Sequence, residues 1–151
     1  MRHGQGTRYS ASRSIRLSAA LALAALALRS LSSRFERVAV VGDSMAPWLL
    51  PGDRLLVWKP RRLGSLRPGD VVIAPDPRVP ARSLVKRVAA VDGSSAWLAG
   101  DNPGRSTDSR DFGPIPLSSV VGRAVYRYAP ATRAGRLDHV PSPEASSAPV
   151  L

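Results

Sequence analysis

Two residues of this 151-residue chain, a serine and a lysine, have the side-chain types and surroundings that suit covalent chemistry. Ser44 stands in the segment GDSMAP, residues 42–47, directly after an apolar run. Small residues before a serine let the backbone turn sharply and leave the hydroxyl exposed. A serine becomes a nucleophile only when a nearby base accepts its proton. Taken alone, Gly-Asp-Ser after a strand is usually an ordinary turn, so the interpretation depends on finding that base.

Lys86 is the best candidate for the base. Of the 22 basic residues only Lys59 and Lys86 are lysine, and the rest are arginine. Arginine does not lose its proton in proteins, whereas burial lowers the pKa of a lysine. The run around Lys86 is apolar, and in a strand Leu84, Lys86 and Val88 share one face. The spacing alone fits a buried base and an edge-strand lysine that reaches solvent equally well.

The remaining composition excludes several other chemistries. The chain has no cysteine, which rules out disulfides, thiol nucleophiles and cysteine-ligated metals. Its two histidines, His3 and His139, lie in segments that read as flexible ends. A Ser-His-Asp triad or a histidine-rich metal site therefore has no histidine inside the domain. We expect no metal and no other cofactor.

Short β-rich runs must position these residues. Pro51-Gly52, Pro68-Gly69 and Asp92-Gly93 supply turns between them, and six short strands at close spacing favour a mainly β fold, a sandwich or a partly open barrel. The compact domain is expected over residues 35–130. Residues 131–151, poor in apolar side chains and rich in proline and serine, are predicted to be a disordered tail. The predicted strands are 38–42, 53–58, 70–74, 83–91, 95–100 and 120–128.

Residues 1–34 form a basic and hydrophobic N-terminal segment. The run at 17–28, LSAALALAALAL, is apolar on every side of a helix, but twelve residues span only about 18 Å of a roughly 30 Å hydrocarbon core. Three interpretations stay open. The run is a membrane anchor recruiting its serine-rich flanks, a cleaved signal peptide, or a helix that lies on or within the protein. For an anchor, the flanking arginines favour a cytoplasmic N-terminus and an extracytoplasmic domain.

The net charge of +11 is uneven, and this bears on the partners. Residues 1–37 hold seven arginines and one glutamate, a net of +6. Attraction to anionic membrane lipid accounts for this cluster. Only 5% of residues are aromatic, and no nucleic-acid-binding motif accompanies the arginines. Membrane lipid is therefore the expected partner, and nucleic acid is not.

Three blocks of this sequence resemble the conserved blocks of a known protein family. The first runs from 42–47 into LLPGD at 49–53, the second is LVKRV at 84–88, and the third is GDNPGRSTDSR at 100–110, followed by Phe112-Gly113. These blocks resemble the conserved boxes of the type I signal peptidases, in the order of that family. The resemblance covers residues 38–128 and implies a signal-peptidase-like β fold.

The resemblance also implies roles for individual residues. Ser44 would be the nucleophile and Lys86 the general base, with Ser106 orienting the lysine amine. Further side chains would support or contact these groups. The supporting residues are Asp108 and Arg110, as an ion pair beneath the site, and Asp101 and Asn102, which shape the adjoining turn. The substrate-binding residues for small side chains are Val40, Val41, Met45, Leu49, Leu84 and Val85. From the residues alone, the ion pair is also an ordinary surface pair, and the apolar residues are also plain core.

The expected function is that of a membrane-anchored serine endopeptidase that cleaves signal or pro-segments of precursor polypeptides after Ala-x-Ala-like sequences. Gly42 departs from family members that have a serine there for the oxyanion hole. The compact size resembles the minimal branch of the family, which includes maturation proteases for nickel superoxide dismutase, so a dedicated substrate is an alternative. A self-cleaving regulator of the SOS-repressor type and a non-catalytic membrane scaffold are the others.

Overall fold

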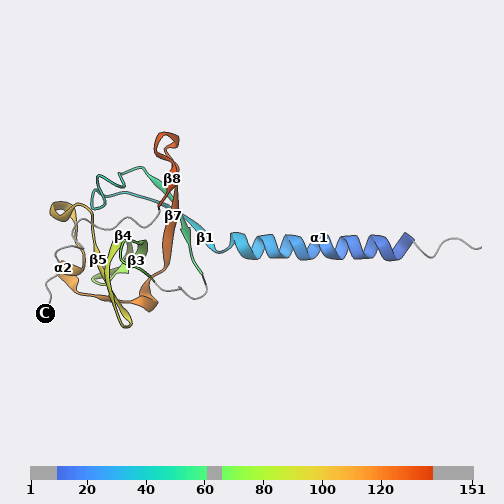
Figure 1. Ribbon diagram of the computed structural model, residues 1–151, viewed down its shortest axis with the longest axis horizontal. Coiled ribbons are helices and arrows are strands. Elements are labelled where there is room, and N and C mark those ends of the chain that lie inside the picture. The colour runs from blue at the N-terminus through green and yellow to red at the C-terminus, as the bar shows by residue number, and fades with distance from the viewer. Residues whose placement is uncertain (1–9, 61–65, 138–151) are drawn as a thin grey trace, which may run out of the picture. The chain divides into compact units, whose positions relative to one another are not determined.

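The N-terminal part of the chain is one helix, α1 (Ser10–Ser32) (Figure 1). The computed structural model describes residues 10–60 and 66–137. It divides into two compact units that meet between Arg34 and Phe35. Alanine and leucine are strong helix formers, which explains why the run at 17–28 is helical. The six leucines of α1 between positions 17 and 31 are each at least 59% exposed. Within the described residues, no helix has both the length and the apolar character that a membrane crossing requires.

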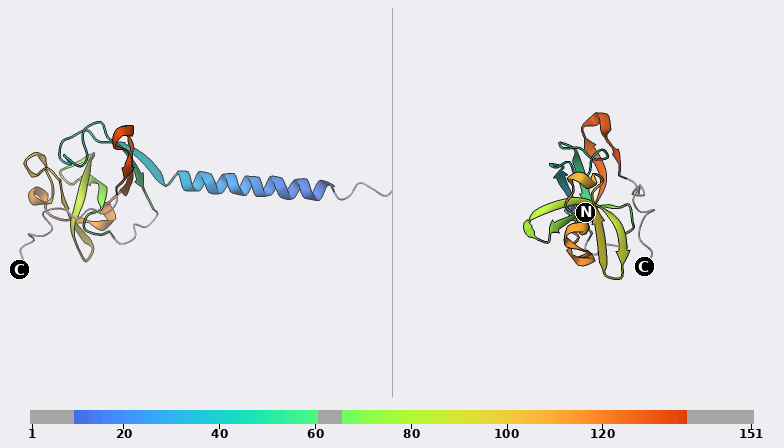
Figure 2. Two further views of the ribbon diagram at one scale, coloured as in Figure 1. Left: turned by 45° about the horizontal axis from the view of Figure 1, so that its top comes forward. Right: turned by 90° about the vertical axis from the view of Figure 1, so that its left-hand side faces the viewer.

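The second unit is mainly β, as the sequence predicts. Helical segments are limited to single turns between strands (Figures 1 and 2). The strands are β1 (Phe35–Ala39), β2 (Arg54–Trp58), β3 (Val71–Asp76), β4 (Val79–Asp92), β5 (Ser95–Ala99), β6 (Ile115–Pro116), β7 (Gly122–Ala129) and β8 (Gly135–Arg136). The turns are the 3-10 helices η1 (Pro103–Arg105), η2 (Leu117–Ser119) and η3 (Ala131–Arg133), and the α-helical turn α2 (Ser109–Phe112).

All eight strands belong to one antiparallel sheet in the order β1-β2-β7-β3-β4-β5-β6, with β8 added beside β7. The described strands therefore form one continuous sheet that is not closed, rather than the two separate sheets of a sandwich. The long strand β4 links its two halves. Up to Arg87 it pairs with β3, and from Arg87 onward it pairs with β5.

Several boundaries differ from the predicted ones. The first strand lies at 35–39 instead of 38–42, because pairing with β2 begins at Phe35. The chain beyond Pro130 does not become a tail at once. Residues 131–136 form η3 and β8, seen as the hairpin of β7 and β8 in Figures 1 and 2. Leu137 is then buried in the core. The rest of the predicted tail, 138–151, lies outside the described residues.

Two turns with the same sequence pattern lead into β2 and β3. In Leu-Pro-Gly-Asp and Arg-Pro-Gly-Asp, the glycines Gly52 and Gly69 have φ of 91° and 96°, a region that favours glycine. The aspartate side chain that follows then accepts a hydrogen bond from the backbone N–H at the start of each turn. Asp53 does so from Leu50 and Asp70 from Arg67, both at 2.9 Å. These local signals explain why the sequence predicts both turns.

The central strand β3 is buried on both faces, and its alternate residues separate two hydrophobic clusters. Val71 and Ile73 pack with β2, β7 and residues 40–49, whereas Val72 and Ala74 pack with β4, β5 and β6. Successive side chains of a strand point to opposite faces, so an uninterrupted apolar run fits a strand covered on both sides. Lys86 of β4 lies opposite Val72, so its side chain lies on the face of the second cluster.

Candidate active site

Ser44 stands in a loop that is anchored at both ends in the core. Met45 and Leu49 are 1% and 0% exposed, and the Leu49 N–H donates to the Met45 carbonyl at 2.8 Å. The Ser44 carbonyl accepts a hydrogen bond from the Asn102 N–H at 3.0 Å, and the Asn102 side chain donates to the Asp43 carbonyl at 3.2 Å. Core packing on one side and the Asn102 turn on the other therefore hold the serine in place.

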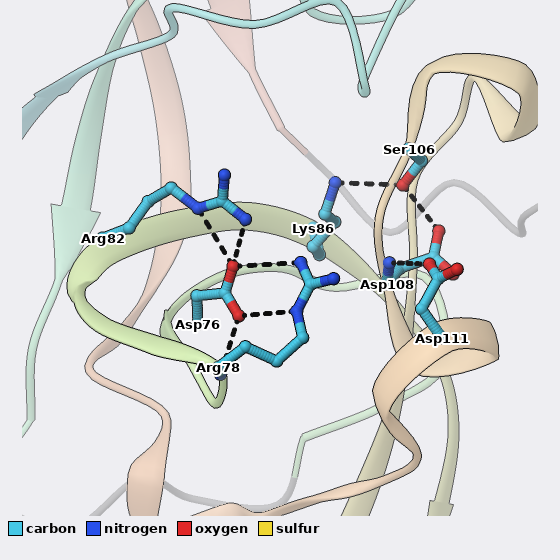
Figure 3. Close-up of polar contacts among 7 residues, drawn as sticks. All are labelled: Asp76, Arg78, Arg82, Lys86, Ser106, Asp108 and Asp111. Carbon is cyan, nitrogen blue, oxygen red and sulfur yellow. Dashed lines mark hydrogen bonds and ion pairs between the residues drawn. The ribbon is translucent and has the colours of Figure 1, made fainter.

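Lys86 reaches the site from β4 and is 3% exposed. Its Nζ donates to Ser106 Oγ at 3.0 Å, and Ser106 Oγ donates in turn to Asp108 Oδ2 at 2.6 Å (Figure 3). A hydroxyl has a single proton, so donation to Asp108 leaves the Ser106 oxygen as an acceptor toward the lysine. The amine is thus held by one of its own N–H groups. In the neutral amine the nitrogen lone pair remains available for another partner.

Asp108 connects this chain of hydrogen bonds to the rest of the domain. It is fully buried, and its carboxylate accepts the Gly100 N–H at 2.9 Å and pairs with Arg110 at 2.7 Å. Asp108 is also the N-cap of α2, where it accepts the Arg110 N–H and donates its own N–H to Asp111 at 2.9 Å. Burial raises the pKa of Asp108, but the hydrogen bonds from Arg110, Ser106 and Gly100 outweigh it and hold the pKa below the usual range. The carboxylate is therefore ionised.

Arg87, the neighbour of the lysine, is a buried residue of the site that was not among the residues predicted from the sequence. It is 2% exposed, donates to Asp101 through Nε at 2.7 Å and Nη2 at 2.6 Å, and donates to the Gly69 carbonyl at 2.9 Å. This buried ion pair fastens the turn at Asp101 to β4. An arginine inside an apolar strand was the available signal.

A second charged cluster, built on the buried Asp76, lies on the other side of Lys86 (Figure 3). Asp76 ends β3 with no exposed surface, and it accepts hydrogen bonds from both Arg78 and Arg82. Burial lowers the pKa of Lys86. The negative charges of Asp108 and, more weakly, Asp76 raise this pKa, whereas the positive charges of Arg82 and Arg110 lower it further. Burial is the largest effect, so the pKa stays below that of an exposed lysine. The environment thus favours the neutral amine, the form that accepts a proton.

Ser44 and Lys86 line one groove of about 570 Å³. Most of the predicted substrate-contacting residues line it as well, whereas Leu49 is fully buried in the core and does not. Leu49 is therefore a core residue, because the loop after Met45 turns inward. The described atoms show no hydrogen bond between the Ser44 hydroxyl and Lys86; such contacts are often long without substrate. The lining residues named from sequence are Val40, Val41, Met45, Leu84 and Val85.

Two strand edges border this groove. Residues 38–41 at the end of β1 line one wall, and β1 pairs with β2 alone. Residues 82–86 of β4 line the other wall, and this part of β4 pairs with β3 alone. Both edges are therefore unpaired within the described part of the chain. An unpaired edge offers a row of backbone N–H and C=O groups to an extended peptide.

Comparison with known proteins assigns the chain to a family. The family described as "Signal peptidase, peptidase S26" matches residues 13–96 and 94–129. The chain therefore belongs to the signal peptidase family of proteases, as the three sequence blocks indicate.

Individual relatives come from mitochondria. The chain is 35% identical over 122 residues to the mitochondrial ATP-independent inner membrane protease subunit 1a of Arabidopsis thaliana, which covers 65% of this chain and 73% of the relative. It is 34% identical over 137 residues to the mitochondrial inner membrane protease subunit 2 of Mus musculus, covering 72% and 78%. A similar protein of Schizosaccharomyces pombe, also named subunit 2, is 32% identical over 124 residues, covering 66% and 68%.

Substitution of Gly100 tests whether peptide cleavage depends on the close packing around Ser44 and Ser106. A Cβ added there would lie 2.5 Å from the Ser44 carbonyl oxygen and 2.6 Å from Ser106 Cβ, so Gly100→Ala must displace both segments. We expect peptide cleavage to fall by about a hundredfold, the order of loss that a displacement of about 1 Å causes. Gly104→Ala is the control, because nothing lies within 4 Å of its added Cβ. Equal kcat/KM values for the two purified variants would contradict this account.

Proposed function

We propose that the chain is a membrane-associated serine endopeptidase in which Ser44 is the nucleophile and Lys86 the general base. The observation that carries the proposal is the buried Lys86 amine, held by Ser106 in the groove that also contains Ser44. The low exposure of Lys86 favours the neutral amine, and the hydrogen bond to Ser106 fixes the orientation of that amine. Membership of a signal peptidase family supports a precursor polypeptide as the substrate class.

The two unpaired strand edges suggest how that substrate binds. An extended precursor segment would lie between residues 38–41 and 82–86 and add a strand to the sheet through backbone hydrogen bonds. Val40, Val41, Leu84 and Val85 line the groove with short branched side chains, which suits small apolar side chains before the cut. Cleavage after an Ala-x-Ala-like sequence follows from this arrangement.

The proposed reaction has two stages. Lys86 Nζ accepts the Ser44 hydroxyl proton as Oγ attacks the carbonyl carbon of the scissile bond. We assign the Ser44 N–H as a backbone donor to the developing oxyanion, since Gly42 offers no hydroxyl for it. The lysine then returns the proton to the departing amine, which leaves an acyl ester on Ser44. Water deprotonated by the same lysine hydrolyses the ester and restores both residues.

Replacing each of the two residues tests this assignment. Ser44→Ala removes the nucleophile, and Lys86→Arg keeps a positive charge but cannot accept a proton at neutral pH. We expect each variant to lose cleavage of an Ala-x-Ala peptide by more than about a thousandfold, because the two groups act as a unit. Lys59→Arg is the matched control, since the chain's other lysine lies on the surface in an ion pair with Glu36. Near-normal turnover by Lys86→Arg would end the Ser/Lys assignment.

The pH dependence of cleavage follows from the state of Lys86. Its pKa is lowered, chiefly by burial, and only the neutral amine accepts the serine proton. kcat/KM should therefore rise as pH increases through this lowered pKa and then level off before the range in which an exposed lysine titrates. The measurement is a kcat/KM profile between about pH 5 and 11. A rise that continues up to the range of an exposed lysine would show that the base is not a buried lysine.

Membrane attachment is proposed to reside in α1. Its leucines are exposed, arginines precede and interrupt its apolar run, and the relatives are inner membrane proteases. An apolar helix with exposed leucines is stabilised by lipid, and arginines at its ends reach the headgroups. The cluster of arginines before the apolar run at 17–28 favours a cytoplasmic N-terminus, with the catalytic unit on the extracytoplasmic side.

Fractionation of cells that express the protein tests the attachment. The full chain should sediment with membranes and stay there after carbonate extraction. A chain that starts at Phe35, the first residue of the second compact unit, should be soluble and still cleave peptides. Recovery of the full chain in the soluble fraction would contradict the role of α1. Loss of cleavage by a folded shortened chain would show that the catalytic unit depends on the helix.

A further inference from the structure

The walls of the groove carry positive charge away from the reacting residues. Its lining includes Arg82 and Arg105 in addition to Lys86, and no aspartate or glutamate. The groove is otherwise lined by short apolar side chains and by serine and threonine. A site that takes only small neutral side chains has no need of a guanidinium. Arg82 lies on the β4 wall, beside the path proposed for the substrate.

The buried carboxylate of Asp76 holds Arg82 in position. The Nε of Arg82 donates to Asp76 Oδ2 at 2.9 Å, and its Nη2 donates to the same oxygen. Arg78 occupies the other side of that carboxylate through Nε at 3.2 Å and Nη2 at 3.3 Å (Figure 3). Two arginines on one buried carboxylate leave a net positive charge. A guanidinium fixed in this way loses little further conformational entropy when it binds an anion.

The other carboxylates near the groove are already engaged. Asp108 is buried and pairs with Arg110, and Asp111 accepts the Asp108 N–H. Asp43 is half exposed and lies 3.9 Å from Arg105, which reduces the charge that Arg105 offers. By contrast, Nη1 of Arg82 has no partner among the described residues, and the Arg82 side chain is 52% exposed. Arg82 thus keeps a donor for a ligand while Asp76 holds its guanidinium in place, whereas Arg105 has only the distant contact with Asp43 to hold it.

The position of Arg82 on β4 sets where a ligand group would lie. Arg82, Leu84 and Lys86 all line the groove, although the pairing of β4 with β3 is irregular before Ser83. Lys86 follows Arg82 by four residues, which is a separation of up to about 13 Å along an extended strand. An extended substrate advances by the same amount per residue. A side chain that contacts Arg82 therefore belongs to the residue about four positions from the scissile bond.

We propose that Arg82 is a specificity-determining residue that binds an aspartate or glutamate of the precursor about four residues from the scissile bond. The inference rests on the proposed function, because it assumes that the groove binds the precursor around its cleavage site. It narrows the substrate class from neutral segments to segments with one carboxylate at a defined place.

A peptide scan tests the proposal on the full-length protein. Each peptide carries one Ala-x-Ala cleavage sequence and a single aspartate at one of the positions up to about five residues on either side of the bond. The same peptide with asparagine at that position is its reference, because asparagine matches aspartate in size without the charge. We expect aspartate to raise kcat/KM about fivefold at one position, near the fourth residue from the bond. The gain should shrink in about 0.5 M salt, which screens exposed charges.

Two arginine variants then separate the groove charge from the Asp76 cluster. In Arg82→Gln the ratio of kcat/KM for the aspartate peptide to kcat/KM for the asparagine peptide should fall to about one. Arg82→Lys should keep part of the preference for aspartate. Arg78→Gln is the matched control, because Arg78 pairs with the same carboxylate but does not line the groove, and it should keep the full ratio. Because each ratio compares two peptides with the same variant, a general loss of activity lowers both kcat/KM values and leaves the ratio unchanged.

Each other outcome overturns the inference. If Arg78→Gln loses the ratio as completely as Arg82→Gln, the preference reflects the integrity of the cluster and not a contact with Arg82. If the neutral peptide is cleaved but aspartate helps at no position, the specificity role is wrong while the proposed function stands. If no peptide is cleaved at all, the proposed function fails, and the inference fails with it.

Discussion

The geometry of the site depends on the buried carboxylate of Asp108. It accepts the Ser106 hydroxyl and the Gly100 N–H, so one ionised group holds two segments of the third sequence block. Through Ser106 it determines the direction of the Lys86 amine. Through Gly100 and the turn that follows, it supports the backbone that binds the Ser44 carbonyl. Ser44 in its loop and Lys86 on β4 need such a common support, because no direct hydrogen bond between their side chains is present among the described residues to fix their separation.

The same physical device recurs through the domain. Besides the ion pair of Asp70 with Arg123 at 3.5 Å, four buried or nearly buried aspartates each accept hydrogen bonds from arginine, and for three of them an arginine comes from another segment of the chain. A buried carboxylate without a partner costs several kcal/mol, and the planar guanidinium offers paired donors that satisfy both oxygens. Much of the arginine excess therefore has a structural use inside the catalytic unit. The pairs are Asp53 with Arg127 and Arg133, Asp76 with Arg78 and Arg82, Asp101 with Arg87, and Asp108 with Arg110.

The open sheet connects this architecture to the proposed chemistry. β1 and the first half of β4 each lack a second neighbour within the described residues, and the groove lies between them. A bound peptide would supply the missing backbone partners and would pass Ser44 and Lys86 as it did so. Under the proposed function, substrate binding and completion of the sheet are one event. Arg82, from the charged cluster at the end of β3, also lines this groove.

Local patterns were enough to predict the turns and most strands, whereas the residues expected in the groove came from the family resemblance. Pro-Gly followed by aspartate specifies a turn through glycine's positive φ and a short side-chain hydrogen bond, both within four residues. The lysine in an apolar strand fitted a buried amine and a side chain that reaches solvent equally well, and only the family resemblance favoured the buried amine. Only the tertiary structure decided the start of β1, the inward turn of Leu49, the packing of Leu137 and the pairing of Arg87 with Asp101. Strand register, burial and ion pairing are set by the segment that lies opposite, and that segment is remote in the sequence.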